Sequence, residues 1–277
     1  RANSDFKDFD FDGSNFSALI DTLAYNTYIT AFNSNMVVNE SFLDSATIRE
    51  NVVSLARNIG YVPRSRSAAK AQISFSYNTT SNASTATLSA GLVCIGTVEN
   101  TNYLFSIPND VSTTIVNGVA SFNNIDVFQG TFLRKQFAVD GSLDQRFLLD
   151  NSFIDSSTIV VKVADLNDTS TGREYSLANN ILNIDSTSEI YLIQEIKDER
   201  YELLFGDGYF GKKLNNGDKI TATYIITDGK DGNGPSNFAY AGRVVDDLGN
   251  AIVPSSDVII TTNISAQNGG DIESVDS

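Results

Sequence analysis

The spacing of apolar residues changes at Ala71, and this change constrains the fold more than any other feature of the sequence. Before Ala71, apolar residues recur every three or four positions, as on one side of a helix. After it, Ile73, Phe75 and Tyr77 alternate with polar residues, as in a half-buried strand. We therefore predict an α+β fold, in which N-terminal amphipathic helices are followed by a predominantly antiparallel β region.

Two helices are expected before the change. The first has its apolar stripe at Phe16, Leu19, Ile20, Leu23, Ala24, Tyr28, Ala31 and Phe32. The polar run Asn33-Ser34-Asn35 weakens this pattern, so whether the helix continues beyond it stays open.

The second helix has clearer boundaries. Thr47 and Glu50 have the spacing of a capping box, and Gly60 followed by Pro63 predicts its end. Its apolar stripe consists of Ile48, Val52, Leu55, Ala56 and Ile59.

Strand-like runs recur after Ala71, separated by turn sequences rich in Gly, Asn, Asp and Ser. They lie at 103–107, 159–163, 190–193, 201–205 and 220–226. We expect a helical segment at 1–70, a β-rich region at 71–247, and a loop-rich connection at 248–277 with one strand at 258–260. The connection is expected to lead to a missing C-terminal part, so that the chain is a fragment of a longer protein.

Composition removes most catalytic and ligand-binding classes. The sequence has no His, which excludes Ser-His-Asp and Cys-His catalysis and the commonest zinc ligand. The net charge of −15 opposes binding to nucleic acid, and no apolar run reaches the ~18–20 residues that span a bilayer. Cys94 lies in an apolar run and is expected to be an inert core residue. We predict no enzyme, no cofactor, no metal and no small-molecule substrate.

The sequence DFDFDG, from Asp8 to Gly13, resembles the first half of a calcium-binding loop. Such a loop needs a bidentate Glu at its twelfth position, which here is Leu19. The favoured interpretation is therefore that Asp12 or Ser14 caps the first helix.

Two further stretches are distinctive. Glycines surround Asp207 in a predicted structural turn formed by Gly206, Asp207, Gly208 and Gly211, for which the alternative is a metal or phosphate loop. Basic residues gather at Arg57, Arg64, Arg66 and Lys70, either as a solvated helix exit or as a contact site for an acidic partner.

Together these stretches resemble one family. The sequence FGDGYFGKKLNNGDKITATYIITDGKDGNG, which begins at Phe205, resembles the characteristic segment of J-like baseplate proteins from contractile phage tails. The helical stretch that ends in LARNIGYVPRSRSAAKA is similar to the N-terminal segment of the large baseplate wedge protein of myophages. The resemblance covers residues 9–80 and 200–238.

The resemblance implies a structural, non-enzymatic subunit of the baseplate wedge. It implies a homodimer that joins wedges into a ring around the tail hub, contacts other wedge subunits and the sheath initiator, and takes part in tail assembly and in sheath attachment and contraction. The expected location is the tail baseplate of the virion, assembled in the host cytoplasm. The helices would contribute to an inter-subunit bundle. The interface candidates are Phe16, Leu19, Ile20, Leu23, Tyr28, Phe32, Ile48, Val52, Leu55, Ile59, Arg64 and Arg66.

Two other functions stay open at this point. One is a β-rich tail adhesin or receptor-binding protein, which the many Ser, Thr and Asn residues would suit. The other is a carbohydrate-active enzyme with a carboxylate pair among the 34 acids. The amphipathic helices favour the wedge subunit, because an isolated adhesin has no evident use for them.

Overall fold

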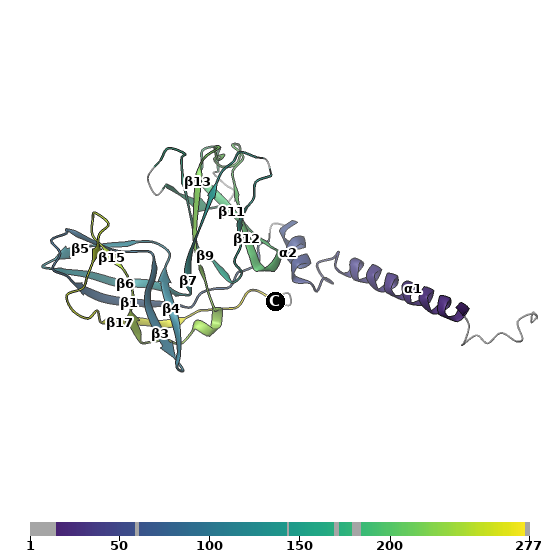
Figure 1. Cartoon of the computed structure of the whole chain (residues 1–277), viewed down its shortest axis with the longest axis horizontal. Coiled ribbons are helices and arrows are strands. Elements are labelled where there is room, and N and C mark those ends of the chain that lie inside the picture. Colours follow the sequence, from purple (N-terminus) through teal and green to yellow (C-terminus); the bar gives the residue numbers. More distant parts are fainter. Residues whose placement is uncertain (1–14, 59–60, 143, 169–171, 179–183, 275–277) are drawn as a thin grey trace, which may run out of the picture. The chain divides into compact units, whose positions relative to one another are not determined.

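The structure is a computed structural model, and it describes residues 15–58, 61–142, 144–168, 172–178 and 184–274. The chain divides into two compact units, Arg1–Val62 with Ser274–Ser277, and Pro63–Glu273. The first contains the helices and is called the helical unit. The second contains all of the described strands and is called the β unit (Figure 1).

The helical unit has two helices, α1 (Asn15–Asn39) and α2 (Arg49–Asn58). Helix α1 runs through the polar Asn33–Asn35 stretch and includes the apolar residues that follow it, which answers the question left open by the sequence. Within it, the hydroxyl groups of Thr22 and Thr27 donate to carbonyls four residues earlier, each at 2.8 Å. These bonds satisfy two polar side chains without breaking the helix.

The start of α2 differs from the prediction. The Glu40 carboxylate accepts hydrogen bonds from the backbone N–H groups of Thr47 at 3.0 Å and Ile48 at 3.2 Å, and from the Asn51 amide at 2.8 Å. These hydrogen bonds lower the pKa of Glu40 to about 2, and the bond from Asn51 has the largest effect. The predicted capping box of Thr47 with Glu50 is therefore wrong, because Thr47 bonds to Glu40, from the turn that precedes α2.

The β unit contains two sheets (Figure 1). The ten-stranded sheet consists of β1 (Lys70–Asn78), β2 (Thr85–Leu88), β3 (Gly91–Val98), β4 (Thr101–Ile107), β5 (Val111–Val116), β6 (Val119–Gln129), β14 (Phe238–Tyr240), β15 (Val244–Val245), β16 (Ala251–Ile252) and β17 (Ile260–Gln267). The seven-stranded sheet consists of β7 (Thr131–Ala138), β8 (Phe147–Leu149), β9 (Ile154–Ala164), β10 (Arg173–Leu177), β11 (Ile190–Ile196), β12 (Arg200–Phe205) and β13 (Lys219–Ile226). Short 3-10 turns occupy Lys197–Glu199 and Gly229–Gly232.

The pairing of the strands is almost entirely antiparallel. The order in the smaller sheet is β7-β13-β9-β10-β11-β12-β8, and only its β10–β11 pair is parallel among the described strands. In the larger sheet the order is β14-β3-β4-β6-β5-β2-β15-β16, with β1 pairing with both β6 and β17. The predicted α+β class, with helices before a mainly antiparallel β region, is confirmed.

Each sheet has its own apolar core. In the ten-stranded sheet, Phe75 and Phe122 stack at 5.0 Å between ring centroids, and Phe105 meets Phe238 edge to face at 5.0 Å. The core of the seven-stranded sheet combines aliphatic, tyrosine and phenylalanine side chains, among them Phe147, whose ring meets Phe205 edge to face, and the fully buried Leu203. Alternation along strands such as β1 thus buries one set of side chains, as the two-residue period predicts.

The chain first passes from the ten-stranded to the seven-stranded sheet at Gly130, and it returns between β13 and β14. Strand β6 ends immediately before Gly130 and β7 begins immediately after it. Gly130 has a φ of 138°, and a Cβ at this position would lie 2.2 Å from the carbonyl oxygen of Ile226. The Ser106 hydroxyl donates to the Gly130 carbonyl at 3.0 Å, which fixes the crossing.

The segment 248–277 differs from the loop-rich connection that was expected. It contains β16 and β17, and β17 pairs with β1 along most of its length. Ile252 lies in the core of the ten-stranded sheet. The strand begins at Ile260, where the expected one ended. Ile260, Ile264 and Ala266 lie on one face of β17, but Thr262 interrupts this apolar alternation and weakens its signal in the sequence.

Candidate interaction surface

Helix α1 exposes large apolar side chains along its whole length. Those exposed to solvent are Phe16, Leu19, Ile20, Leu23, Tyr25, Tyr28, Phe32, Met36, Val37 and Val38. Tyr28 is 67% exposed and Val37 66% exposed, values typical of surface residues and unusual for side chains of this size in a row. Contiguous exposed apolar surface of this kind marks sites of protein association.

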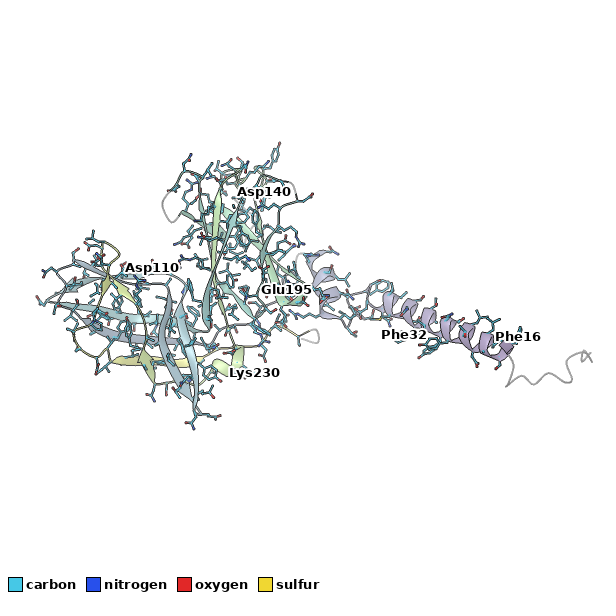
Figure 2. The ribbon with its side chains drawn as sticks, viewed as in Figure 1. Phe16, Phe32, Asp110, Asp140, Glu195 and Lys230 are labelled. Atoms are coloured by element: carbon cyan, nitrogen blue, oxygen red, sulfur yellow. The ribbon has the colours of Figure 1, made fainter. Side chains whose placement is uncertain are left out.

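These side chains form two patches on different sides of α1. At about 100° per residue, Phe16, Leu19, Ile20 and Leu23 cluster on one side, which we call the N-terminal patch. Tyr25, Tyr28, Phe32 and Met36 cluster on the roughly opposite side, which we call the middle patch. Figure 2 labels Phe16 and Phe32, one from each patch.

The predicted single stripe is therefore corrected. The steps of four residues from Ile20 through Tyr28 to Phe32 turn by about 40° each, because four residues exceed one helical turn. Tyr25 and Met36 belong to the middle patch, and sequence reasoning missed both. The apolar run Met36-Val37-Val38 was the available signal.

Helix α2 is more buried than α1. Val53 and Ala56 are buried, Val52 and Leu55 are half-buried, and Ile48 is 38% exposed. Other predicted positions fall outside the part of the chain that the structure describes: Ile59 and Gly60, and the residues of the calcium and helix-cap interpretations, Asp8, Asp10, Asp12, Gly13 and Ser14.

The structure places the two candidate arginines differently. The Arg66 guanidinium lies 4.5 Å from the centre of the Phe153 ring and 3.4 Å from the Asp271 carboxylate. Its side chain is only 21% exposed, so most of its interactions are within the β unit. The Arg64 side chain is exposed, while its backbone N–H donates to Glu273 at 2.8 Å. Of the two, only Arg64 forms no ion pair with a residue in the described part of the chain.

The glycine-rich turn is held by Asp207. Its Oδ1 accepts hydrogen bonds from the N–H groups of Phe210 and Tyr209, each at 2.9 Å, and these bonds keep the pKa of Asp207 below its usual range. Tyr209 stands 89% exposed at the tip.

This turn requires glycine for two different reasons, a positive φ at two positions and a close backbone contact at a third. Gly208 and Gly211 have positive φ values of 94° and 81°. Gly206 is not in that region, but a Cβ on it would lie 2.2 Å from the carbonyl carbon of Gly211. We infer a structural role for this turn, as the sequence predicted.

The described residues offer neither a metal site nor a membrane-spanning helix. No group of three or more His, Cys, Asp or Glu side chains is arranged to hold a metal ion there. None of the helices in that part of the chain is long and apolar enough to cross a membrane. Cys94 is fully buried in the ten-stranded sheet, and burial raises the pKa of its thiol to about 12.

Comparison with known proteins identifies the relatives of this chain. Residues 1–61 match the family model of the helical domain of gp6-like baseplate wedge proteins. The whole chain is 30% identical, over 303 aligned residues, to the baseplate wedge protein gp6 of Enterobacteria phage T4. The chain is a relative of gp6-like baseplate wedge proteins. The resemblance that the sequence suggested is confirmed.

The relationship to gp6 extends over all of this chain but only part of the relative. The alignment covers 100% of the chain and 43% of the phage T4 protein, so the chain spans less than half the length of that relative. The matched family segment includes the whole of α1 and α2. The relationship supports a structural role in the tail baseplate of a virion.

Proposed function

We propose that this chain is a structural part of the baseplate wedge of a contractile phage tail, and that α1 joins it to neighbouring subunits. The observation that carries the proposal is the exposed apolar surface of the 25-residue α1. A helix of this length gains most of its stability from packing, so an apolar surface left in water favours association. The relationship to a structural wedge protein supports a non-enzymatic role.

The two patches support a bundle of more than two helices. One partner helix covers a single stripe of another, whereas the N-terminal and middle patches of α1 lie on roughly opposite sides. We therefore propose that one patch contacts a second copy of this chain and the other contacts another wedge subunit. The further roles are proposed on the family relationship alone: linking wedges into a ring around the tail hub, contacting the sheath initiator, and taking part in sheath attachment and contraction.

Charge placed in each patch tests this proposal. Leu19→Glu with Leu23→Glu changes the N-terminal patch, and Tyr28→Glu with Phe32→Glu changes the middle patch. An unpaired carboxylate is costly to bury, so each double variant should lose one association while the chain stays folded. Light scattering measures self-association, and co-expression with the neighbouring tail genes measures binding to other wedge subunits.

A control variant of the same helix distinguishes the effect of a charge placed in an apolar patch from the effect of added charge alone. Asn26→Glu with Asn33→Glu adds the same charge at two exposed polar positions of α1. This variant should associate like the wild type. Normal association of both patch variants would refute the proposal, and so would equal loss in the control.

A further inference from the structure

The outer face of the seven-stranded sheet borders a cavity of about 700 Å³. Strands β7, β13 and β9 supply most of this face with side chains that point away from the core, and the loop before β5, where Figure 2 labels Asp110, supplies part of the rim. The polar side chains that these three strands contribute are Arg134, Gln136, Lys162, Lys219, Thr221 and Thr223. We call this set the cationic face.

The three cations of this face share one sheet surface and form no ion pair with any residue that the structure describes. Most basic side chains of the β unit form ion pairs within it, namely Arg66, Lys70, Lys135, Arg146, Arg173, Arg200, Lys212 and Lys230. Arg134, Lys162 and Lys219 form none with any described residue, although the chain carries a net charge of −15. Three free cations on one face of so acidic a protein are available to an outside anion.

Strand register spaces these cations widely. Arg134 lies opposite Thr223, and Lys162 lies opposite Thr221, two residues further along β13. Lys219 lies two residues beyond Thr221 on the same strand. Sheet dimensions then put the Cα atoms of Lys162 and Lys219 about 8 Å apart and those of Arg134 and Lys162 about 12 Å apart.

Three acids, Asp110, Asp168 and Glu174, also line the cavity. Asp110 accepts a hydrogen bond from the Ala90 N–H at 2.7 Å, so one of its oxygens is engaged. Asp168 follows the end of β9, and Glu174 lies on β10 beside Lys162, beyond ion-pair distance. Strands β7, β13 and β9, at one end of the sheet, therefore present three cations, and β10 adds Glu174 next to Lys162.

We propose that the cationic face binds an extended acidic segment of a neighbouring protein. Carboxylates on alternate residues of an extended chain are about 7 Å apart on one side, which suits cations at the observed spacing. The long Lys and Arg side chains adapt to several carboxylates, whereas small-molecule pockets are mostly apolar. A nucleic acid is disfavoured as the occupant, because its backbone is bound by Lys and Arg clustered along a stripe, and three widely spaced cations form no such stripe. This surface is separate from α1, and the proposal does not depend on helix association.

A peptide-binding measurement tests the proposal on the full chain. The probe is a short fluorescent peptide in which Glu alternates with Thr, and fluorescence anisotropy follows its binding at low salt. The same peptide with Gln in place of Glu should not bind. The triple variant Arg134→Gln, Lys162→Gln and Lys219→Gln should bind the Glu peptide at least about tenfold more weakly, since each exposed charge pair contributes modestly and three are lost.

A second triple variant controls for total charge. Arg57→Gln, Lys213→Gln and Arg243→Gln remove three exposed cations elsewhere and should leave binding within about twofold of the wild type. Equal weakening in both triple variants would overturn the proposal, as would the absence of binding by the wild type. It would also be overturned if a single-stranded oligonucleotide bound the face more tightly than the peptide, or if millimolar free glutamate displaced the peptide.

Discussion

Helix α1 and the β unit use the same kinds of side chain in opposite ways. The β unit buries its large aromatic residues, as at Phe105 and Phe122, which are almost completely inaccessible to solvent. Helix α1 leaves Phe16 and Phe32 more than half exposed. The difference is between a region that buries its aromatic residues within its own fold and a helix on which they stay exposed.

This contrast separates residues that stabilise the fold of the chain from residues that we expect to contact other subunits. In the β unit, removal of an apolar side chain costs contacts that the chain makes with itself. In α1, the same removal costs little until another subunit covers the helix. The stability of the chain and its association with other subunits should therefore respond to different substitutions. The same substitution made once in the β unit and once in α1 tests this difference.

The largest expected effect is from Phe105→Ala. This side chain is fully buried and contacts Phe238 edge to face, so its loss leaves a cavity and should lower the free energy of unfolding by about 3–5 kcal/mol. Phe32→Ala removes the same atoms from an exposed position of α1 and should change the unfolding of the isolated chain by less than about 0.5 kcal/mol. Urea unfolding followed by circular dichroism measures both.

Equal destabilisation by the two changes would remove the distinction between the regions. A result in which Phe32→Ala is silent in unfolding but weakens association would sharpen it, because α1 would then contribute through its neighbours alone.

A smaller effect is expected in the turn around Asp207. Gly206→Ala places a Cβ 2.2 Å from the backbone of Gly211 and should cost about 2–3 kcal/mol of stability, because backbone must move. Gly249→Ala is the matched control, since Gly249 has a φ of 82° but nothing within 4 Å of its Cβ. The control should cost about 1 kcal/mol from backbone strain alone.

These two substitutions distinguish two reasons for a glycine: the close contact of Gly206 with neighbouring backbone, and the positive φ of Gly249. A smaller loss at Gly206 than at Gly249, measured as the midpoint of thermal unfolding, would show that the turn accommodates the added atom. The turn would then be less rigid than its hydrogen bonds to Asp207 indicate.

Sequence periodicity predicted the class of fold because it records one-sided burial. The run from Ile73 to Tyr77 alternates cleanly, and β1 indeed buries these residues. Strand β6 was missed although it spans 11 residues. Its Asn123-Asn124 pair interrupts the alternation, and Asn124 has a positive φ of 54° at an irregularity of the ladder.

The candidate surfaces were predictable to different degrees. The apolar residues of α1 are neighbours in sequence, so the spacing alone showed that they share one helix. The cationic face unites Arg134, Lys162 and Lys219 from three strands whose register is set by distant pairing. Single-sequence patterns contain no such register. Of the basic cluster that they did show, Arg66 and Lys70 form ion pairs within the β unit, whereas Arg57 and Arg64 are exposed.

The smallest expected effect is local and concerns Glu40 in the helical unit. Its carboxylate holds the N–H groups that begin α2, and its pKa is lowered to about 2 from an ordinary value of 4.5. A group whose pKa is lower in the folded state stabilises that state above its unfolded pKa. The contribution should therefore be complete above pH ~5 and should disappear as the pH falls from 4.5 towards 2.

Hydrogen exchange at the amides of Thr47 and Ile48 measures this contribution directly. Glu40→Gln should speed their exchange at neutral pH, and the ratio of its rate to that of the wild type should shrink as the pH approaches 2. Glu50→Gln is the control, because Glu50 is exposed and has no hydrogen bond to a described residue, and it should leave both amides unchanged. If Glu50→Gln had the larger effect, the reciprocal capping of Thr47 and Glu50 expected from the sequence would describe the start of α2 better than Glu40 does. If neither substitution changed exchange, the helical unit would hold α2 by packing alone, and the contrast with the β unit would be weaker than the exposed apolar residues of α1 indicate.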